Sequence, residues 1–130
     1  MTEYEALSLM AAFFTSNAVF FLGSIVAVWL GFRISNNIYE AGNAPVIAKA
    51  LATIYCLCVA VFMFRTLSQQ VSLLNDFTMG FSQLAETTEI SAAAQRMVNF
   101  DATVPSIING VFVLSIILFQ MAGVWMKKSD

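Results

Sequence analysis

Residues 43–65 read NAPVIAKALATIYCLCVAVFMFR, an apolar stretch with one charged residue, Lys49, before its closing Arg65. A helix needs about 20 residues to cross the roughly 30 Å hydrocarbon core of a bilayer, and this stretch is long enough. Small residues recur in it at every fourth position: Ala44, Ala48, Ala52, Cys56 and Ala60. In lipid, a face of small side chains lets the backbone of another helix come close. The stretch therefore predicts a membrane-spanning helix that packs against its neighbours.

The whole chain has the composition of a membrane protein. Its 130 residues are 59% hydrophobic and 11% charged, and the mean hydropathy is +0.79. These values are too apolar for a soluble domain of this length. Besides residues 46–64, the stretches 17–34 and 104–126 are long enough to cross a bilayer. We therefore expect an all-α membrane protein, in which residues 1–130 form a single bundle of three transmembrane helices.

The first apolar stretch carries a second row of small residues, Gly23, Ala27 and Gly31, also four positions apart. The two rows could face each other and give a close, right-handed helix crossing. Small residues are common in this chain, however, and a run of five at this spacing would arise by chance roughly one time in ten. We interpret both rows as helix-packing faces.

The segments between the spans differ from one another. Residues 35–44 (SNNIYEAGNA) predict a short turn, with Asn43 as the cap of the next helix and Pro45 in its first turn. Residues 66–100 are polar and carry apolar side chains at intervals of three or four, which predicts an amphipathic helical segment. This segment either continues the second span or turns near Gly80 and lies along the membrane interface. Asp101 then offers a cap before the third span.

The N-terminal apolar stretch is longer than one crossing requires. It predicts either one long, tilted helix or a short interfacial helix that leads into the span. The first ten residues contain acidic but no basic side chains. Because a cleavable signal peptide needs a basic N-terminal region, we expect the first span to stay in the mature protein.

Basic and aromatic residues predict the orientation in the membrane. Arg33, Lys49, Lys127 and Lys128 fall on one side of a three-span arrangement, whereas Arg65 and Arg96 fall on the other. The more basic side is expected to be cytoplasmic. Trp29 and Trp125 lie towards that side and, with the basic residues at the span ends, would anchor the interface. The N-terminus and residues 66–100 would then lie outside, in the periplasm if the source is bacterial.

The sequence offers few groups for chemistry. It contains no histidine, and all eight acidic residues lie outside the predicted spans, which disfavours a carboxylate-coupled transporter. Cys56 and Cys58 are two positions apart and point to different helix faces, so neither a disulfide nor a metal pair is expected. Phosphate-binding loops and nucleophile motifs are absent from the sequence. We expect no catalytic, cofactor or metal site, and a net charge of −2 without a basic run makes nucleic acid an implausible partner.

The polar residues inside the spans are uncharged: Asn17, Thr53, Asn109, Ser115 and Gln120. Such side chains usually form hydrogen bonds between helices in lipid, and we favour this interpretation. The alternative places Asn109 and Gln120 in a polar pore or ligand pocket built by an oligomer.

Three functional hypotheses follow. The leading one is a non-catalytic structural or accessory subunit of a homo-oligomer or of a larger membrane complex. The second is an oligomeric pore or channel, similar to a holin only in size, number of spans and basic C-terminus. The third is a small subunit that lends a quinone- or pigment-binding groove to a redox complex; it lacks the convergent polar groups that cofactor sites need.

Overall fold

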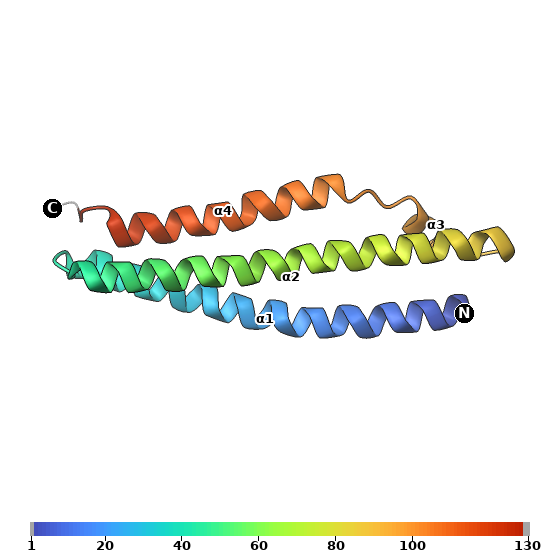
Figure 1. The fold of residues 1–130 in the computed structure, drawn as a ribbon, viewed down its shortest axis with the longest axis horizontal. Helices are drawn as coiled ribbons and strands as arrows, with labels where there is room; N and C mark the ends of the chain where they lie inside the picture. Colours follow the sequence, from blue (N-terminus) through green and yellow to red (C-terminus); the bar gives the residue numbers. More distant parts are fainter. Residues whose placement is uncertain (1, 129–130) are drawn as a thin grey trace.

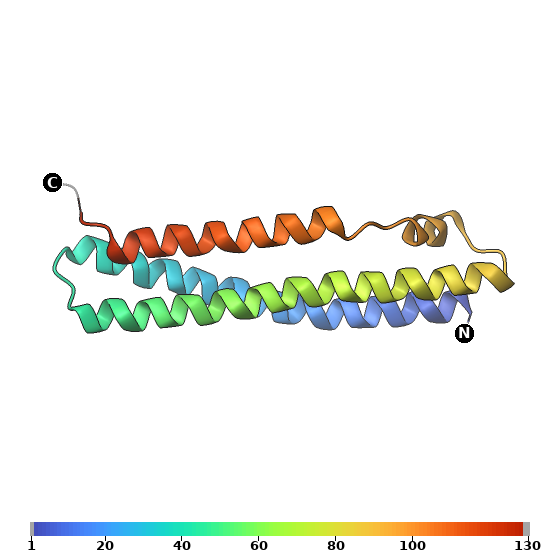
Figure 2. The same ribbon diagram turned by 45° about the horizontal axis from the view of Figure 1, so that its top comes forward.

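The computed structural model describes residues 2–128, which form four helices and no strand: α1 (Glu3–Ala41), α2 (Val46–Thr87), α3 (Ala92–Val98) and α4 (Thr103–Trp125). Figure 1 shows α1 and α2 as a long antiparallel hairpin. The last helix, α4, lies along the half of the hairpin nearest its turn, and α3 lies beside the far end of α2 (Figures 1 and 2). The end of α4 is therefore at the hairpin turn, and the start of α1 is at the opposite end.

Helices α1, α2 and α4 are each long and apolar enough to cross a membrane. The all-helical fold and the three candidate spans predicted from the sequence are thus confirmed, and their length and composition suggest a membrane protein. The helices differ greatly in length. At 1.5 Å per residue, the 39 residues of α1 and the 42 of α2 extend about 58 and 63 Å, whereas the 23 of α4 extend about 35 Å.

Two alternatives left open by the sequence are decided by these lengths. Residues 3–41 form one long helix, without a separate interfacial helix before the span. Helix α2 passes Gly80 without a break and ends at Thr87, so its outer half continues the second span. A glycine inside a helix lowers its stability by only about 1 kcal/mol, which packing on both sides of Gly80 can offset.

The predicted turn at residues 35–44 is wrong over most of its length. Helix α1 continues to Ala41 and ends where Gly42 adopts a left-handed conformation with φ of +72°. Glycine adopts this conformation without the steric penalty of a side chain, so it marks the end of the helix better than the serine and asparagines before it. The expected cap, Asn43, is also wrong, because Pro45 occupies the N-cap position of α2.

Two groups of buried apolar side chains hold the helices together. The inner core joins α1, α2 and α4, and its buried members are Val28, Val59, Ala60, Met63, Leu67, Val113 and Ile116. The outer core joins the start of α1, the end of α2 and α3 through Ala6, Phe81 and Ala94. Phe77 and Leu84 pack against the outer core. Part of the apolar face predicted within residues 66–100 is therefore covered by the chain itself.

Polar contacts fix the start of each outer element. Thr2 and Glu5 form a reciprocal capping box at the start of α1. The hydroxyl of Ser91 accepts a hydrogen bond from the backbone N–H of Ala94 and so caps α3. The carboxylate of Glu3 accepts hydrogen bonds from the backbone N–H of Ser91, at 3.2 Å, and from its hydroxyl. The first turn of α1 is thereby joined to the first turn of α3.

Asp101 gives a prediction about pH. Its Oδ1 accepts the backbone N–H of Thr103 at 2.9 Å, and this hydrogen bond lowers the pKa of the Asp101 carboxyl below its usual value. The ionised side chain therefore stabilises the start of α4 above about pH 3.9, and this effect is lost as the pH falls through the lowered pKa. An NMR titration of Asp101 should show a midpoint below about 3.9.

The matched variant is Thr103→Ala, which keeps the backbone N–H and removes the Thr103 hydroxyl, the second group whose hydrogen bond lowers the pKa of Asp101. Its Asp101 midpoint should move upward, towards about 3.9. An unchanged midpoint in this variant would show that the Thr103 hydroxyl does not lower the pKa of Asp101, and a midpoint at about 3.9 would show that the backbone N–H does not.

Candidate functional site

Gln120 of α4 is the centre of a polar contact between the three long helices. Its side chain is only 1% exposed, and Nε2 donates a hydrogen bond to the carbonyl oxygen of Val28 in α1 at 3.2 Å. The other amide atom, Oε1, is buried and has no hydrogen-bond partner in the part of the chain that the structure describes. The side chain of Gln120 therefore joins α4 to α1 through its nitrogen atom alone.

Two further hydrogen bonds connect the same helices. The hydroxyl of Ser35 in α1, which is 3% exposed, donates to the backbone carbonyl of Gln120 at 2.6 Å. The hydroxyl of Tyr55 in α2 donates to the carbonyl of Ala27 in α1 at 3.1 Å. Hydrogen bonds of this type between membrane helices contribute roughly 0.6 to 2 kcal/mol each. We call Gln120, Ser35, Tyr55, Gly31 and Gly123 the polar node.

The two glycines of the node allow the helices to approach. A Cβ atom on Gly31 would lie 2.6 Å from Nε2 of Gln120 and 3.4 Å from Sγ of Cys56. A Cβ atom on Gly123 would overlap the hydroxyl of Ser35 and lie 3.3 Å from its carbonyl oxygen. Either Cβ atom would force a neighbouring group to shift, and the nearest groups are the Gln120 amide and the Ser35 hydroxyl, which form the hydrogen bonds between α1 and α4.

The row of small residues on α2 faces its neighbours along most of its length. Ala52, Cys56 and Ala60 are buried, Ala48 is half-buried, and Ala44 is half-buried in the turn before the helix. Cys58 is exposed on another face of α2. Among the described residues, no group of three or more cysteine, aspartate or glutamate side chains could hold a metal ion.

The row on α1 is only partly buried within this chain. Gly31 is buried and Ala27 is half-buried, but Gly23 is exposed and has open space where a Cβ atom would be. Residues four apart on an α-helix are rotated by about 40°, so the row turns away from the partner within two steps. A hollow of about 310 Å³ separates α1 and α2 beside Gly23. Within this chain, Gly23 is not a packing residue.

The remaining predicted polar residues have separate positions. Asn17 is buried, and its Nδ2 approaches the carbonyl of Thr66 at 3.5 Å, a long and therefore weak hydrogen bond. Ser115 donates only within its own helix, to Val111. Asn109 lines a hollow of about 280 Å³ between α2 and α4, together with four other polar residues: Ser68, Ser72, Asn75 and Ser106. Asn109 and Gln120 thus belong to different sites.

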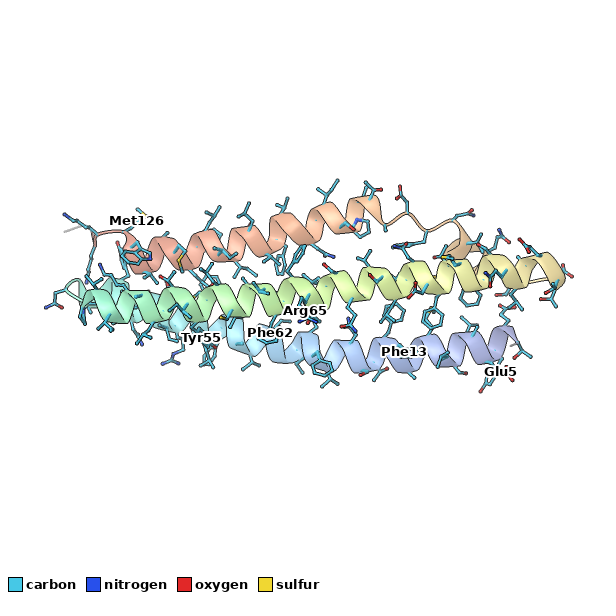
Figure 3. All side chains as sticks on the ribbon, viewed as in Figure 1. Glu5, Phe13, Tyr55, Phe62, Arg65 and Met126 are labelled. Carbon is cyan, nitrogen blue, oxygen red and sulfur yellow. The ribbon has the colours of Figure 1, made fainter. Side chains whose placement is uncertain are left out.

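Most of the predicted interface anchors gather at the hairpin turn. The indole nitrogen of Trp125 donates to the hydroxyl of Thr53 at 2.9 Å, and Nζ of Lys49 lies 5.8 Å from the Trp125 ring. Lys128 forms an ion pair with Glu40 at 3.0 Å. These contacts tie the end of α4 to both arms of the hairpin. Figure 3 shows Met126 at this end of the molecule.

The other four predicted anchors, Trp29, Arg33, Arg65 and Lys127, are exposed. The guanidinium of Arg33 lies 5.2 Å from the ring of Trp29, one turn earlier on α1. Lys127 is exposed. Arg65 is exposed near the middle of the long helix α2 (Figure 3), where the predicted second span ends.

Sequence analysis missed three residues of the polar node. Ser35 was assigned to the turn, and Tyr55 and Gly123 were not singled out. One signal was available for Gly123, since a glycine within an apolar helix lowers helix stability and often marks a close contact. Ser35 has no such local signal, because its role depends on the position of α4.

The polar node bonds helices to one another and uses uncharged groups throughout. It brings Gln120 together with one row residue of each other helix, Gly31 and Cys56, and leaves Asn17 and Asn109 elsewhere. We therefore interpret it as a packing site.

Comparison with protein-family models, with curated proteins and with solved structures finds no match to this chain.

Proposed function

We propose that the chain is a non-catalytic small integral membrane protein that serves as a structural or accessory subunit of a homo-oligomer or of a larger membrane complex. The observation that supports this role is a set of exposed apolar side chains, Tyr4, Leu9 and Met79, on the outer part of the hairpin, beyond the reach of α4. We call these three residues the outer surface.

The position of α4 defines the outer part. The residue before α4, Ala102, lines the same hollow as Val71 and Asn75 of α2. The last twelve or so residues of α2, the facing part of α1 and all of α3 therefore lie past the end of α4. If α1, α2 and α4 share one bilayer, these outer segments stand outside it, since α4 alone is about 35 Å long.

Large apolar side chains are exposed on these outer segments. Tyr4 is 79% exposed, Leu9 41% and Met79 63%. Leu9 also lines a hollow of about 430 Å³ between α1 and α2, beside Phe77 and Gly80. Within a bilayer, exposed apolar groups face lipid, but outside it a large exposed apolar surface usually marks a contact with another protein. The outer surface thus supports assembly with further subunits.

We also propose that the outer segments lie on the non-cytoplasmic side and that residues 66–100 act there as an amphipathic element. The hairpin turn carries the contacts of Lys49 and Lys128, and Lys127 lies beside it. The basic end of a small membrane protein faces the cytoplasm. The C-terminus would then be cytoplasmic and the N-terminus outside, in the periplasm of a bacterium.

Native mass spectrometry of the protein, extracted gently from its own membrane, tests the assembly. The expected result is a stable homo-oligomer or a stoichiometric complex with other membrane subunits. The double variant Leu9→Ala and Met79→Ala should lose this association, because it removes two exposed apolar side chains from the outer surface.

The matched control is Leu118→Ala with Phe119→Ala, which removes two exposed apolar side chains from α4. It should keep the association. If the wild-type protein is monomeric and free of associates, the proposed function is wrong. If only the α4 variant dissociates, the contact lies within the membrane and the outer surface is not its site.

The pore hypothesis is less well supported. It required Gln120 to face water in an oligomer, but the Gln120 side chain is buried and bonded to Val28 within one copy of the chain. A water-lined path through this position would require the polar node to separate. We therefore prefer the accessory role.

A further inference from the structure

The hollow that contains Asn109 is lined mostly by uncharged polar residues, five of the eight. Ser68, Ser72 and Asn75 of α2 face Ser106 and Asn109 of α4 across it, and its volume is about 280 Å³. We call it the polar hollow. It lies at the end of α4 opposite Trp125, away from the polar node, and its Asn75 is one helical turn before Met79 of the outer surface.

The polar side chains of the hollow have unused hydrogen-bonding capacity. Other hydroxyl groups in these helices, such as those of Thr66 and Ser115, donate to the carbonyl four residues earlier. In contrast, the side chains of Ser68, Ser72, Asn75, Ser106 and Asn109 form no hydrogen bond with any described group of the chain. Three hydroxyls and two amides therefore offer both donors and acceptors to the same small space.

The lining also limits the kind of ligand. It contains no charged side chain, so it lacks the arginine or lysine that would favour a phosphate and the carboxylate that would favour a cation. Its volume lies just below the range of about 300–1,000 Å³ that is typical of drug-sized ligands. The hollow thus suits one small, uncharged group that carries several hydroxyls.

The position of the hollow along the helices corresponds to the ends of the predicted spans. Phe64 and Ala102 line it, and these residues lie at the end of the predicted second span and just before the third. Phe64 is exposed, as are Ile107 and Ile108 of α4, so apolar surface borders the hollow on the side of the span. If the helices cross a bilayer as their composition suggests, lipid head groups lie at this level.

We propose that the polar hollow binds an uncharged, hydroxyl-bearing group of the size of one sugar or glycerol unit. The same chemistry occurs in the head group of a neutral glycolipid and in a free sugar. The proposal does not require subunit assembly, because all the residues that line the hollow belong to one copy of the chain.

The test uses the full-length protein in nanodiscs that contain equal amounts of monogalactosyl diacylglycerol and phosphatidylcholine. Phosphatidylcholine has no free hydroxyl and serves as the reference lipid. Lipid that remains bound after extraction is counted by native mass spectrometry. We expect the wild-type protein to retain more galactolipid than phosphatidylcholine. In the variant Ser72→Ala with Asn109→Ala, the ratio of retained galactolipid to phosphatidylcholine should fall about tenfold, the effect of removing two ordinary hydrogen bonds.

The matched control is Ser16→Ala with Asn43→Ala, which also removes one hydroxyl and one amide, from exposed positions outside the hollow. This control should retain the enrichment. Addition of free galactose identifies the source of the ligand: if it displaces the galactolipid at millimolar concentration, a free sugar is sufficient, and if it does not, the lipid form is required. Equal retention of both lipids by the wild-type protein, or the same loss in both double variants, would overturn the proposal.

Discussion

Replacing Gly123 by alanine is expected to lower the free energy of unfolding by about 1–3 kcal/mol, as extra methyl groups do in tightly packed cores. The new Cβ atom would overlap the Ser35 hydroxyl and press on the carbonyl oxygen of the same residue. The Ser35 hydroxyl cannot move away freely, because it donates to the backbone carbonyl of Gln120 at 2.6 Å. Either that hydrogen bond or the approach of α1 to α4 must give way.

The measurement is reversible unfolding of the purified protein in lipid nanodiscs, compared among three glycine variants. Gly31→Ala should also destabilise the protein, because its Cβ atom would meet the amide of Gln120. Gly110→Ala is the control on the same helix as Gly123, since no atom lies within 4 Å of its Cβ position. Alanine favours a helix more than glycine does, so the control should be neutral or stabilised by up to about 1 kcal/mol.

A second change tests whether Ser35 is the cause. Ser35→Gly removes the side chain that Gly123→Ala would strike, so the double variant should lose less stability than the sum of the two single variants. If the two effects simply add, the cost of Gly123→Ala does not come from the contact with Ser35. In that case the close approach of the two helices is not what limits the size of residue 123.

The number of long helices could be predicted from the sequence, because each long apolar stretch is long enough for one helix that could span a bilayer. Twenty apolar residues in a row have few other stable arrangements, whatever the rest of the chain does. The packing role of the row from Ala52 to Ala60 could likewise be predicted, because a face of small residues lets two helices approach closely. Gly23 shows where that argument fails. The spacing of four residues extends to Gly23 on α1, but the position at which α1 and α2 separate depends on both helices.

The polar node could not be predicted for a related reason. Ser35 lies among asparagines and other turn-forming residues, and its own neighbours favour an end to the helix. Only Gln120 and Gly123, 85 or more residues later in the chain, provide the acceptor and the space that make it a helical packing residue. The same holds for Phe81, which is buried beside Ala6 of a helix that begins at Glu3.

Gln120 gives the second large effect. Gln120→Ala should lower the free energy of unfolding by about 2–5 kcal/mol, because it leaves a cavity where three helices meet and removes the bond to Val28. Gln120→Leu is the decisive comparison. Leucine fills a similar volume, and it removes an amide whose Oε1 is buried without a partner. The carbonyl of Val28 keeps its bond within α1, so Gln120→Leu should remain within about 1 kcal/mol of the wild-type protein.

The two variants together separate packing from hydrogen bonding. If volume determines the stability at this position, the alanine variant is much less stable than the leucine variant, and the polarity of Gln120 is secondary. If the leucine variant is as unstable as the alanine variant, the amide must be held by more than the single bond to Val28, and Oε1 must have a partner in the membrane. That partner would come from a group outside the chain, such as a buried water or a neighbouring subunit, and Gln120 would then belong to the assembly surface.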